Sequence, residues 1–178
     1  MDLATARLDL HPLPLAVVEA LLADDVALAD RLTPYPVTAE TFAGDGSVLR
    51  FRRDQLRADP SELPWLYHAA VLRSSGQVVA RAGFHAPPDA GGTVEIGYRV
   101  RPEHQRQGLA TEVVAGMLAW AGEHGAVRCL GSTAPGNVAS QAVLARFGFV
   151  RTGEQWDDED GLEWVFTLEP LPSVPGLR

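Results

Sequence analysis

The chain has 178 residues, an apolar fraction of 46% and a formal net charge of −8, which together fit one domain with a sizeable core. The acidic balance disfavours nucleic-acid binding, and no apolar run is long enough to span a membrane. Cys129 is the only cysteine, so the sequence excludes an internal disulfide and a cysteine-based metal cluster and is typical of a cytoplasmic protein.

Hydrophobic periodicity and turn residues divide the chain into short strands and helices. In chain order we predict a strand at residues 5–10, helices at 15–22 (continuing through 26–32) and 48–58, strands at 65–73, 78–84 and 93–100, a helix at 107–124, a strand at 127–132, a helix at 137–147, and strands at 149–154 and 162–168. This order predicts an α/β (α+β) fold with a mixed, mostly antiparallel central sheet of about seven strands flanked by about four helices.

No shift in composition marks a domain boundary. We therefore expect residues 1–169 to form a single domain, and residues 170–178, which contain three prolines, to form a poorly ordered tail. All fifteen basic residues are arginine, a bias that indicates a bacterial genome of high GC content. The five histidines lack the spacing of metal ligands, so we predict no metal site.

Residues 94–111 combine a strand, a charged loop and the start of a long helix. Val94, Ile96, Tyr98 and Val100 alternate with polar residues or glycine, and Pro102 ends the strand because it cannot donate to a ladder. The amides of a helix's first turn lack intrahelical acceptors, and the helix dipole favours anions there. The segment 105–110 therefore indicates a phosphate-binding turn.

The order of elements and the segment Gln105-Arg106-Gln107-Gly108-Leu109-Ala110 together resemble the GNAT superfamily of acyl-CoA-dependent N-acetyltransferases. The family pattern is a Gln or Arg, two variable residues, Gly, one variable residue, then Gly or Ala. The resemblance covers roughly residues 5–168. The start of the chain and the segments 96–98 and 137–144 resemble the branch that includes the ribosomal-protein N-terminal acetyltransferases, which also holds enzymes that acetylate small amines.

This resemblance implies that acetyl-CoA is the acetyl donor. It implies that the amides at the helix start hold the pyrophosphate, that Arg106 adds a charged contact, and that the strand from Tyr98 to Val100 offers its backbone to the pantetheine arm, with an amide near Val100 polarising the thioester carbonyl. The implied cofactor-binding residues are Tyr98, Val100, Gln105, Arg106, Gln107, Gly108, Leu109, Ala110, Thr111 and Asn137.

Glu95 is the candidate general base, because the family often places a glutamate on this strand and a carboxylate can deprotonate an amine directly or through one water. An ordinary solvent-facing strand residue is the alternative interpretation. His68 and His85 are alternative bases on the acceptor side. The acidic run 157–160 is either a solvated turn or, by hypothesis, a border of the acceptor mouth that attracts a cationic amine.

Asn137 and Ser140 begin the helix 137–147, and Asn137 is a good N-cap. In the family this asparagine also contacts the pantetheine arm. Many members carry a tyrosine on this helix as general acid toward the CoA thiolate, but this chain has Val143, Leu144 and Phe147 in that region. Related enzymes use a serine, so Ser140 is the candidate acid or stabiliser of the thiolate, with a purely capping role as the alternative.

The predicted function is transfer of an acetyl group from acetyl-CoA to a primary amine, directly within a ternary complex. The acceptor is either a protein or peptide N-terminus or a small molecule. A catalytically silent acetyl-CoA sensor is the alternative, motivated by the missing tyrosine, and a longer acyl group is a further option. A homodimer is the default oligomeric state.

Overall fold

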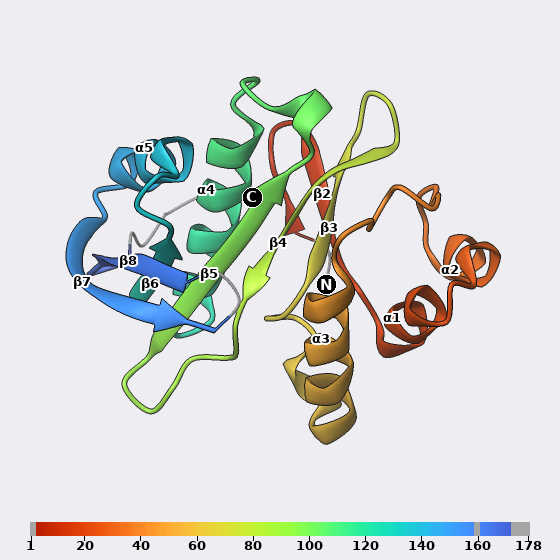
Figure 1. Ribbon diagram of the computed structural model, residues 1–178, viewed down its shortest axis with the longest axis horizontal. Helices are drawn as coiled ribbons and strands as arrows, with labels where there is room; N and C mark the ends of the chain where they lie inside the picture. Colours follow the sequence, from red (N-terminus) through yellow and green to blue (C-terminus); the bar gives the residue numbers. More distant parts are fainter. Residues whose placement is uncertain (1–2, 159–160, 172–178) are drawn as a thin grey trace.

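The computed structural model describes residues 3–158 and 161–171, which form one open sheet with helices on both faces (Figure 1). The strands are β1 (Leu3–Ala4), β2 (Leu8–Pro12), β3 (His68–Leu72), β4 (Gln77–Phe84), β5 (Thr93–Val100), β6 (Arg128–Thr133), β7 (Val150–Asp157) and β8 (Gly161–Leu168). The helices are α1 (Leu15–Leu22), α2 (Val26–Leu32), α3 (Gly46–Ala58), α4 (Leu109–Glu123) and α5 (Val138–Arg146), with 3-10 turns η1 (Pro60–Glu62) and η2 (Pro102–His104).

The sheet has eight strands in the order β1-β2-β3-β4-β5-β6-β8-β7. All neighbours are antiparallel except β5 and β6, which run parallel. The parallel pairing joins Thr93 to Arg128, Val94 to Cys129 and Glu95 to Leu130, and the recorded pairing goes no further. The two strands therefore separate after Glu95, the third of the eight residues of β5.

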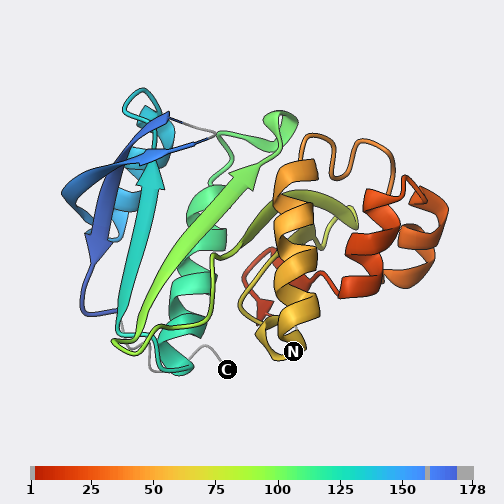
Figure 2. The same cartoon turned by 60° about the horizontal axis from the view of Figure 1, so that its bottom comes forward.

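Each face of the sheet packs against its own set of helices. Ala70 of β3 lies in a core with Val114 and Met117 of α4, whereas its neighbour Ala69 lies in a second core with Val18 of α1 and the apolar face of α3. This split follows from the two-residue period of a strand, which sends successive side chains to opposite faces. Figure 2 shows α3 and α4 on opposite sides of the central strands.

The predicted fold class is confirmed, with small differences at the edges of the elements. β1 adds a strand to the sheet because Leu3 and Ala4 pair with Leu10 and Asp9. The predicted first strand begins only at Leu8, because the Thr5 hydroxyl and the Leu8 amide hydrogen-bond across a turn (3.1 Å). Residues 26–32 form a separate helix rather than a continuation, since the Asp25 side chain caps a new N-terminus at Leu28 N (2.9 Å).

Leu171, inside the predicted tail, packs against the domain. This residue is 7% exposed, packs in the larger core and donates its amide to the Val127 carbonyl (3.0 Å), because an apolar side chain is stabilised by burial. Residues 172–178 lie outside the described part of the chain.

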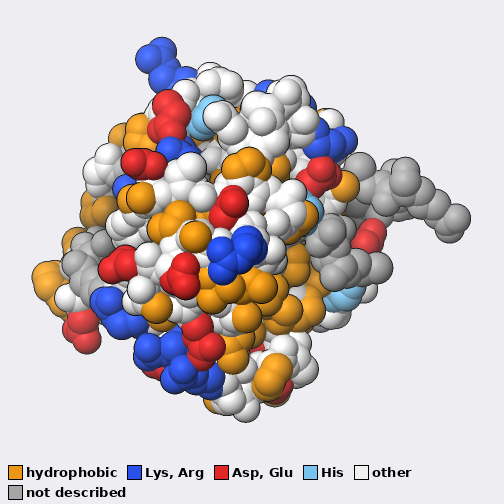
Figure 3. Space-filling view, turned by 90° about the vertical axis from the view of Figure 1, so that its right-hand side faces the viewer, with side chains coloured by type: hydrophobic (Ala, Val, Ile, Leu, Met, Phe, Trp, Pro, Cys, Tyr) orange, Lys and Arg blue, Asp and Glu red, His pale blue; other side chains and the backbone are white. Residues whose placement is uncertain are grey.

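Charged side chains of both signs are mixed on one face of the molecule. Figure 3 shows the side formed by the helices at the right of Figure 1, where acidic and basic side chains are interspersed among apolar ones rather than gathered into one basic field. Among the described helices, none is long and apolar enough to cross a membrane.

Glu112 fastens the N-terminal segment to α4. The Thr5 hydroxyl and the Arg7 amide both donate to its Oε1 (2.6 Å each), and Arg7 Nε donates to Oε2 (2.6 Å). Burial opposes ionisation of this carboxyl, but these hydrogen bonds outweigh it and lower the pKa of Glu112 below its usual value. The first strands and the first turn of α4 are thereby held as one unit.

We expect Glu112→Gln to lower the free energy of unfolding by about 2 kcal/mol at neutral pH, because the charged acceptor of several hydrogen bonds is lost. A lowered native pKa stabilises the fold above the unfolded-state pKa, and this contribution disappears as pH falls through the native pKa. Urea unfolding at pH 7 and at pH 4 should show the difference between wild type and variant shrinking in acid. The same substitution at the exposed Glu123 of α4 is the control, and an equal loss there would contradict the assignment.

Candidate active site

A groove opens where β5 and β6 diverge. A cavity of about 430 Å³ lies there, bounded by β5, the turn before α4 and α5. The sequence-predicted residues that line it are Tyr98, Val100, Gln105, Arg106, Gly108, Leu109, Ala110, Thr111, Asn137 and Ser140. Two predicted residues lie elsewhere: Gln107 is outside the lining, and Glu95 belongs to the opposite face of β5. The lining also includes Arg99, His104 and Arg146.

The backbone of β5 offers hydrogen-bond donors to this groove. The amides of His85 and Arg101 donate to the carbonyls of Glu95 and Val79 (2.9 Å each), so the odd-numbered residues of β5 direct their backbone groups to β4. Tyr98 and Val100 alternate with these residues, so their backbone N–H and C=O groups point to the edge of β5 that faces the groove. The Gln105 side chain donates to the Val100 carbonyl (3.1 Å), and the two amides remain as a ladder edge for an extended ligand.

The turn from β5 into α4 has two residues in the left-handed region. Arg106 has φ 61° and Gly108, the N-cap of α4, has φ 78°. Glycine adopts this conformation without steric penalty, and its missing side chain lets a ligand approach the first amides of the helix. Arg7 Nη1 donates to the Gln107 carbonyl (3.1 Å), so the turn is also held from outside. This contact explains why Gln107 does not face the groove.

α5 brings a second arginine to the same side of the cavity. Arg146 Nη1 donates to the Thr111 hydroxyl in the first turn of α4 (3.2 Å), and both residues line the cavity. Asn137 caps α5 by accepting from the Ser140 amide (3.1 Å), as its residue type suggests. The sequence drew no attention to Arg146, because nothing in the pattern shows that α5 lies against α4.

A tyrosine hydroxyl lies beside Ser140, but it comes from β5. The hydroxyls of Tyr98 and Ser140 are 2.8 Å apart, at the side of the groove where α5 begins. Burial raises the pKa of Tyr98, which keeps its hydroxyl protonated at neutral pH. The resemblance implies a tyrosine on the helix and gives Tyr98 only a backbone role. The alternation of β5 is the signal for its side chain, because alternation directs Tyr98 to the same layer as α5.

Glu95 and His85 form a polar pair on the other face of β5. His85 Nδ1 lies 3.5 Å from Glu95 Oε2, and the Ser132 hydroxyl donates to Oε1 (2.6 Å). The pKa of Glu95 is lowered, chiefly by the hydrogen bond with His85 and further by that from Ser132, against the opposing effects of burial and of Asp157. Glu95 is therefore an anion at neutral pH, and Asp157 of the predicted acidic turn lies within its electrostatic reach. Glu159 and Asp160 of that turn lie outside the described residues.

The remaining candidates occupy other surroundings. His68 is 3% exposed in β3, with its Nδ1 3.3 Å from the Leu66 carbonyl, which fits a structural role. Cys129 is fully buried, and burial raises the pKa of its thiol to about 12, which suits packing rather than nucleophilic attack. Within residues 3–158 and 161–171, no group of three or more His, Cys, Asp or Glu is arranged to hold a metal ion.

Comparison with known families and proteins gives a consistent result. The family model described as the acetyltransferase (GNAT) domain matches residues 7–150. Two proteins of Bacillus subtilis (strain 168) are similar in sequence: the uncharacterized N-acetyltransferase YjdG, 30% identical over 81 residues (45% of this chain, 48% of YjdG), and the uncharacterized N-acetyltransferase YoaA, 30% identical over 82 residues (46% of each chain). The chain thus matches about half the length of these curated relatives.

Solved structures share the fold at low sequence identity. The ribosomal-protein-S5-alanine acetyltransferase of Vibrio fischeri is 16% identical with a TM-score of 0.65, covering 98% of this chain and 100% of that one. RimJ of Mycobacterium smegmatis, solved in complex with CoA-disulfide, is 21% identical with a TM-score of 0.63, covering 91% of this chain and 81% of its own. These likenesses show that the chain shares their fold.

We expect His85→Ala to raise the pKa of Glu95, because the substitution removes the interaction that contributes most to stabilising its carboxylate. NMR titration of the glutamate side-chain carboxyl carbons, with Glu95→Gln used for assignment, would measure the change. His104→Ala, which alters the far side of the groove, should leave the pKa of Glu95 where it is. A Glu95 pKa that does not respond to loss of His85 would remove the pair as an electrostatic unit.

Proposed function

The chain belongs to the acetyltransferase (GNAT) family, and from this we propose that it transfers the acetyl group of acetyl-CoA to a primary amine by direct attack in a ternary complex. The observation that carries the proposal is the open edge of β5, which runs into a left-handed turn at the N-terminus of α4. An extended arm with amide groups, ending in phosphates, is the ligand that such an edge and turn suit.

The residues around the groove fit this cosubstrate. The amides that begin α4, together with Arg106 and Arg146, would hold the pyrophosphate, and the amides of Tyr98 and Val100 would hold the pantetheine arm. One of these two amides would also polarise the thioester carbonyl as its oxygen gains charge. Acetyl-CoA supplies the activated acetyl group, and the chain supplies orientation and charge stabilisation.

On the acceptor side, we propose that Glu95 and His85 act together as the base. The amine must lose a proton for its nitrogen to form a bond to the acetyl carbon, and the pair accepts that proton. Glu95 holds Nδ1 of His85, while Nε2 lies beside Gly97, since a Cβ on Gly97 would come within 3.4 Å of it. The carboxylate thus orients the imidazole.

On the donor side, we propose that the Tyr98 hydroxyl stabilises the departing thiolate, with Ser140 orienting it. A thiol has a pKa near 8.5, below that of a tyrosine. Tyr98, whose pKa is raised further by burial, therefore donates a hydrogen bond to the thiolate rather than losing its proton to it. The missing helix tyrosine had motivated the alternative of a silent sensor. Because the Tyr98 hydroxyl from β5 can take the role of the helix tyrosine, the absence of that tyrosine no longer argues for a sensor.

The acceptor class remains a primary amine in this proposal. The structural neighbours include an acetyltransferase whose name specifies a ribosomal-protein alanine. The acidic groups near Glu95 favour approach of a cationic amine.

Isothermal titration with acetyl-CoA should show saturable binding, and a thiol-release assay should show CoA production with at least one member of an amine and peptide panel. Arg146→Gln should weaken acetyl-CoA binding about tenfold, the loss of one charge-assisted contact, while Arg31→Gln on α2 should not. Absence of binding at millimolar acetyl-CoA would overturn the proposal. Binding without thiol release across the panel would favour the sensor.

Glu95→Gln should reduce kcat about 100-fold and leave the affinity for acetyl-CoA unchanged, because a lost base affects the chemical step and not the groove on the other face of β5. Stopped-assay kinetics with the best acceptor of the panel measures kcat, and titration measures the affinity. Glu123→Gln is the matched control. A Glu95→Gln enzyme with wild-type kcat would assign deprotonation to solvent.

A further inference from the structure

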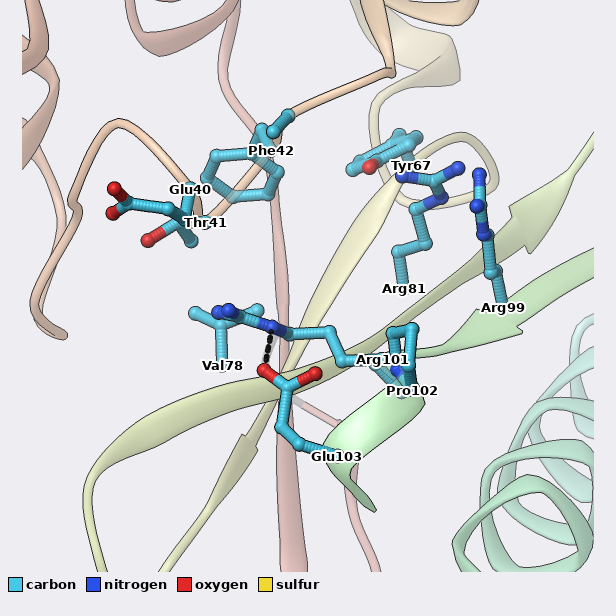
Figure 4. Close-up of a pocket in the computed structure, with 12 residues that line it drawn as sticks. Glu40, Thr41, Phe42, Tyr67, Val78, Arg81, Arg99, Arg101, Pro102 and Glu103 are labelled. Atoms are coloured by element: carbon cyan, nitrogen blue, oxygen red, sulfur yellow. Dashed lines mark ion pairs between the residues drawn. The ribbon is translucent and has the colours of Figure 1, made fainter. Parts of the chain in front are cut away.

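A second cavity lies on the α3 side of the sheet. Its volume is about 250 Å³, and its walls come from the loop before α3, from β4, and from the end of β5 with the start of η2. Phe42, Tyr67 and Val78 form an apolar wall, and three arginines, Arg81, Arg99 and Arg101, reach toward the space (Figure 4). We call this the arginine pocket. No element of the proposed mechanism uses it.

Two of the three arginines have carboxylate partners. Arg81 forms an ion pair with the fully buried Asp45, which also accepts from the Tyr67 hydroxyl. Arg101 pairs with Glu103 (2.8 Å). Among the described residues, no carboxylate forms an ion pair with Arg99.

Glu40 is the remaining acid of the pocket and does not neutralise Arg99. A hydrogen bond from Thr38 and one within its own backbone account for most of the lowering of its pKa, and Arg101 adds to it. Figure 4 shows Glu40 across the pocket from Arg99. The pocket therefore presents one uncompensated guanidinium beside apolar surface.

Sheet register places the two strand arginines opposite each other. Arg81 of β4 pairs directly with Arg99 of β5, and their guanidinium groups lie side by side in Figure 4. Like charges on directly opposite strand residues repel. Burial and the charge of Arg99 lower the pKa of Arg81 to about 10, consistent with that repulsion. An anion at this point would pair with Arg99 and would lie beside the guanidinium of Arg81, which is already paired with Asp45.

The arginine pocket is connected to the proposed reaction centre through β5. Glu95, Gly97 and Arg99 are every second residue of β5 and therefore share one face of the strand. At roughly 3.3 Å per residue, the Cα atom of Arg99 lies about 7 Å from that of Gly97 and about 13 Å from that of Glu95. Arg99 also lines the groove proposed for acetyl-CoA. A molecule whose amine lies near Glu95 and His85 can thus place a second group at Arg99.

We propose that the arginine pocket binds an anionic group of the acceptor. The substrate class is then an amine that carries a carboxylate or a phosphate several bonds away from its nitrogen. The cavity is too small for a whole drug-sized ligand, which needs ≈300 Å³ or more, and suits one end of such a molecule. This inference rests on the proposed acetyltransferase function for its choice of ligand, although the charges and the register that support it are independent of that function.

Matched acceptor pairs test the proposal. ε-Aminocaproate is compared with ε-aminocaproamide, and aminohexyl phosphate with aminohexanol, so that only the anionic group differs within each pair and the two pairs distinguish carboxylate from phosphate. We expect kcat/KM for at least one anionic member to exceed that of its neutral partner about tenfold, through a lower KM. Arg99→Gln should abolish this preference, Arg99→Lys should keep part of it, and Arg31→Gln should keep all of it. Arg81 is not substituted, because its loss would leave the buried carboxylate of Asp45 without its ion-pair partner.

Direct titration with ε-aminocaproate and with aminohexyl phosphate, in the presence of saturating CoA, separates failure of the pocket from failure of the enzyme. Acetyl transfer with no preference for anionic acceptors, or a preference that survives in Arg99→Gln, overturns the arginine pocket and leaves the acetyltransferase standing. Binding of an anionic probe that Arg99→Gln abolishes, without acetyl transfer, supports the pocket and contradicts the proposed reaction. Neither binding nor transfer contradicts both.

Discussion

The separation of β5 from β6 after Glu95 is the constraint on which the rest of the site depends. α5 packs against β6 beside this opening. Its Leu144 is almost fully buried over Gly131 of β6, where a Cβ would come within 3.1 Å of the leucine side chain and 3.8 Å of Ile96. A side chain at position 131 would therefore require Leu144 to shift by a few tenths of an ångström.

β5 then separates two chemical environments by strand alternation alone. Tyr98 points toward the layer of α4 and α5, where the groove is lined by amides, hydroxyls and arginines. Glu95 and Arg99 point toward the layer of α3, where the polar pair with His85 and the arginine pocket lie. A thioester and an amine can therefore approach the same strand from opposite faces. The titratable groups are tuned accordingly, because Glu95 is held as an anion while Tyr98 is held as a neutral donor.

Sequence reasoning reached the parts of this site that are encoded locally. The strand at residues 93–100, the start of the long helix after Gly108 and the capping Asn137 each depend on neighbours a few positions away, and the structure has them close to where the sequence pattern predicts them. The contacts that join distant segments were out of reach. Tyr98 meets Ser140 across 42 positions, and Arg146 meets Thr111 across 35, through packing that no single periodicity describes. The arginine pocket likewise requires the β4–β5 register. β1 was not predicted, because a strand of two residues is too short to show a hydrophobic periodicity.

The turn before α4 shows how fold stability and ligand binding are linked in this chain. Arg106 has φ 61°, a conformation that is uncommon for a residue with a side chain and costs on the order of 1 kcal/mol. Such strain persists only where surrounding contacts hold it. Here Arg7 supplies them, since it donates to the Gln107 carbonyl and is itself bound by Glu112 in the first turn of α4. The N-terminal segment, four strands away from β5 at β1, thus stabilises the amide cluster. Loosening it would destabilise both the fold and the conformation of this turn.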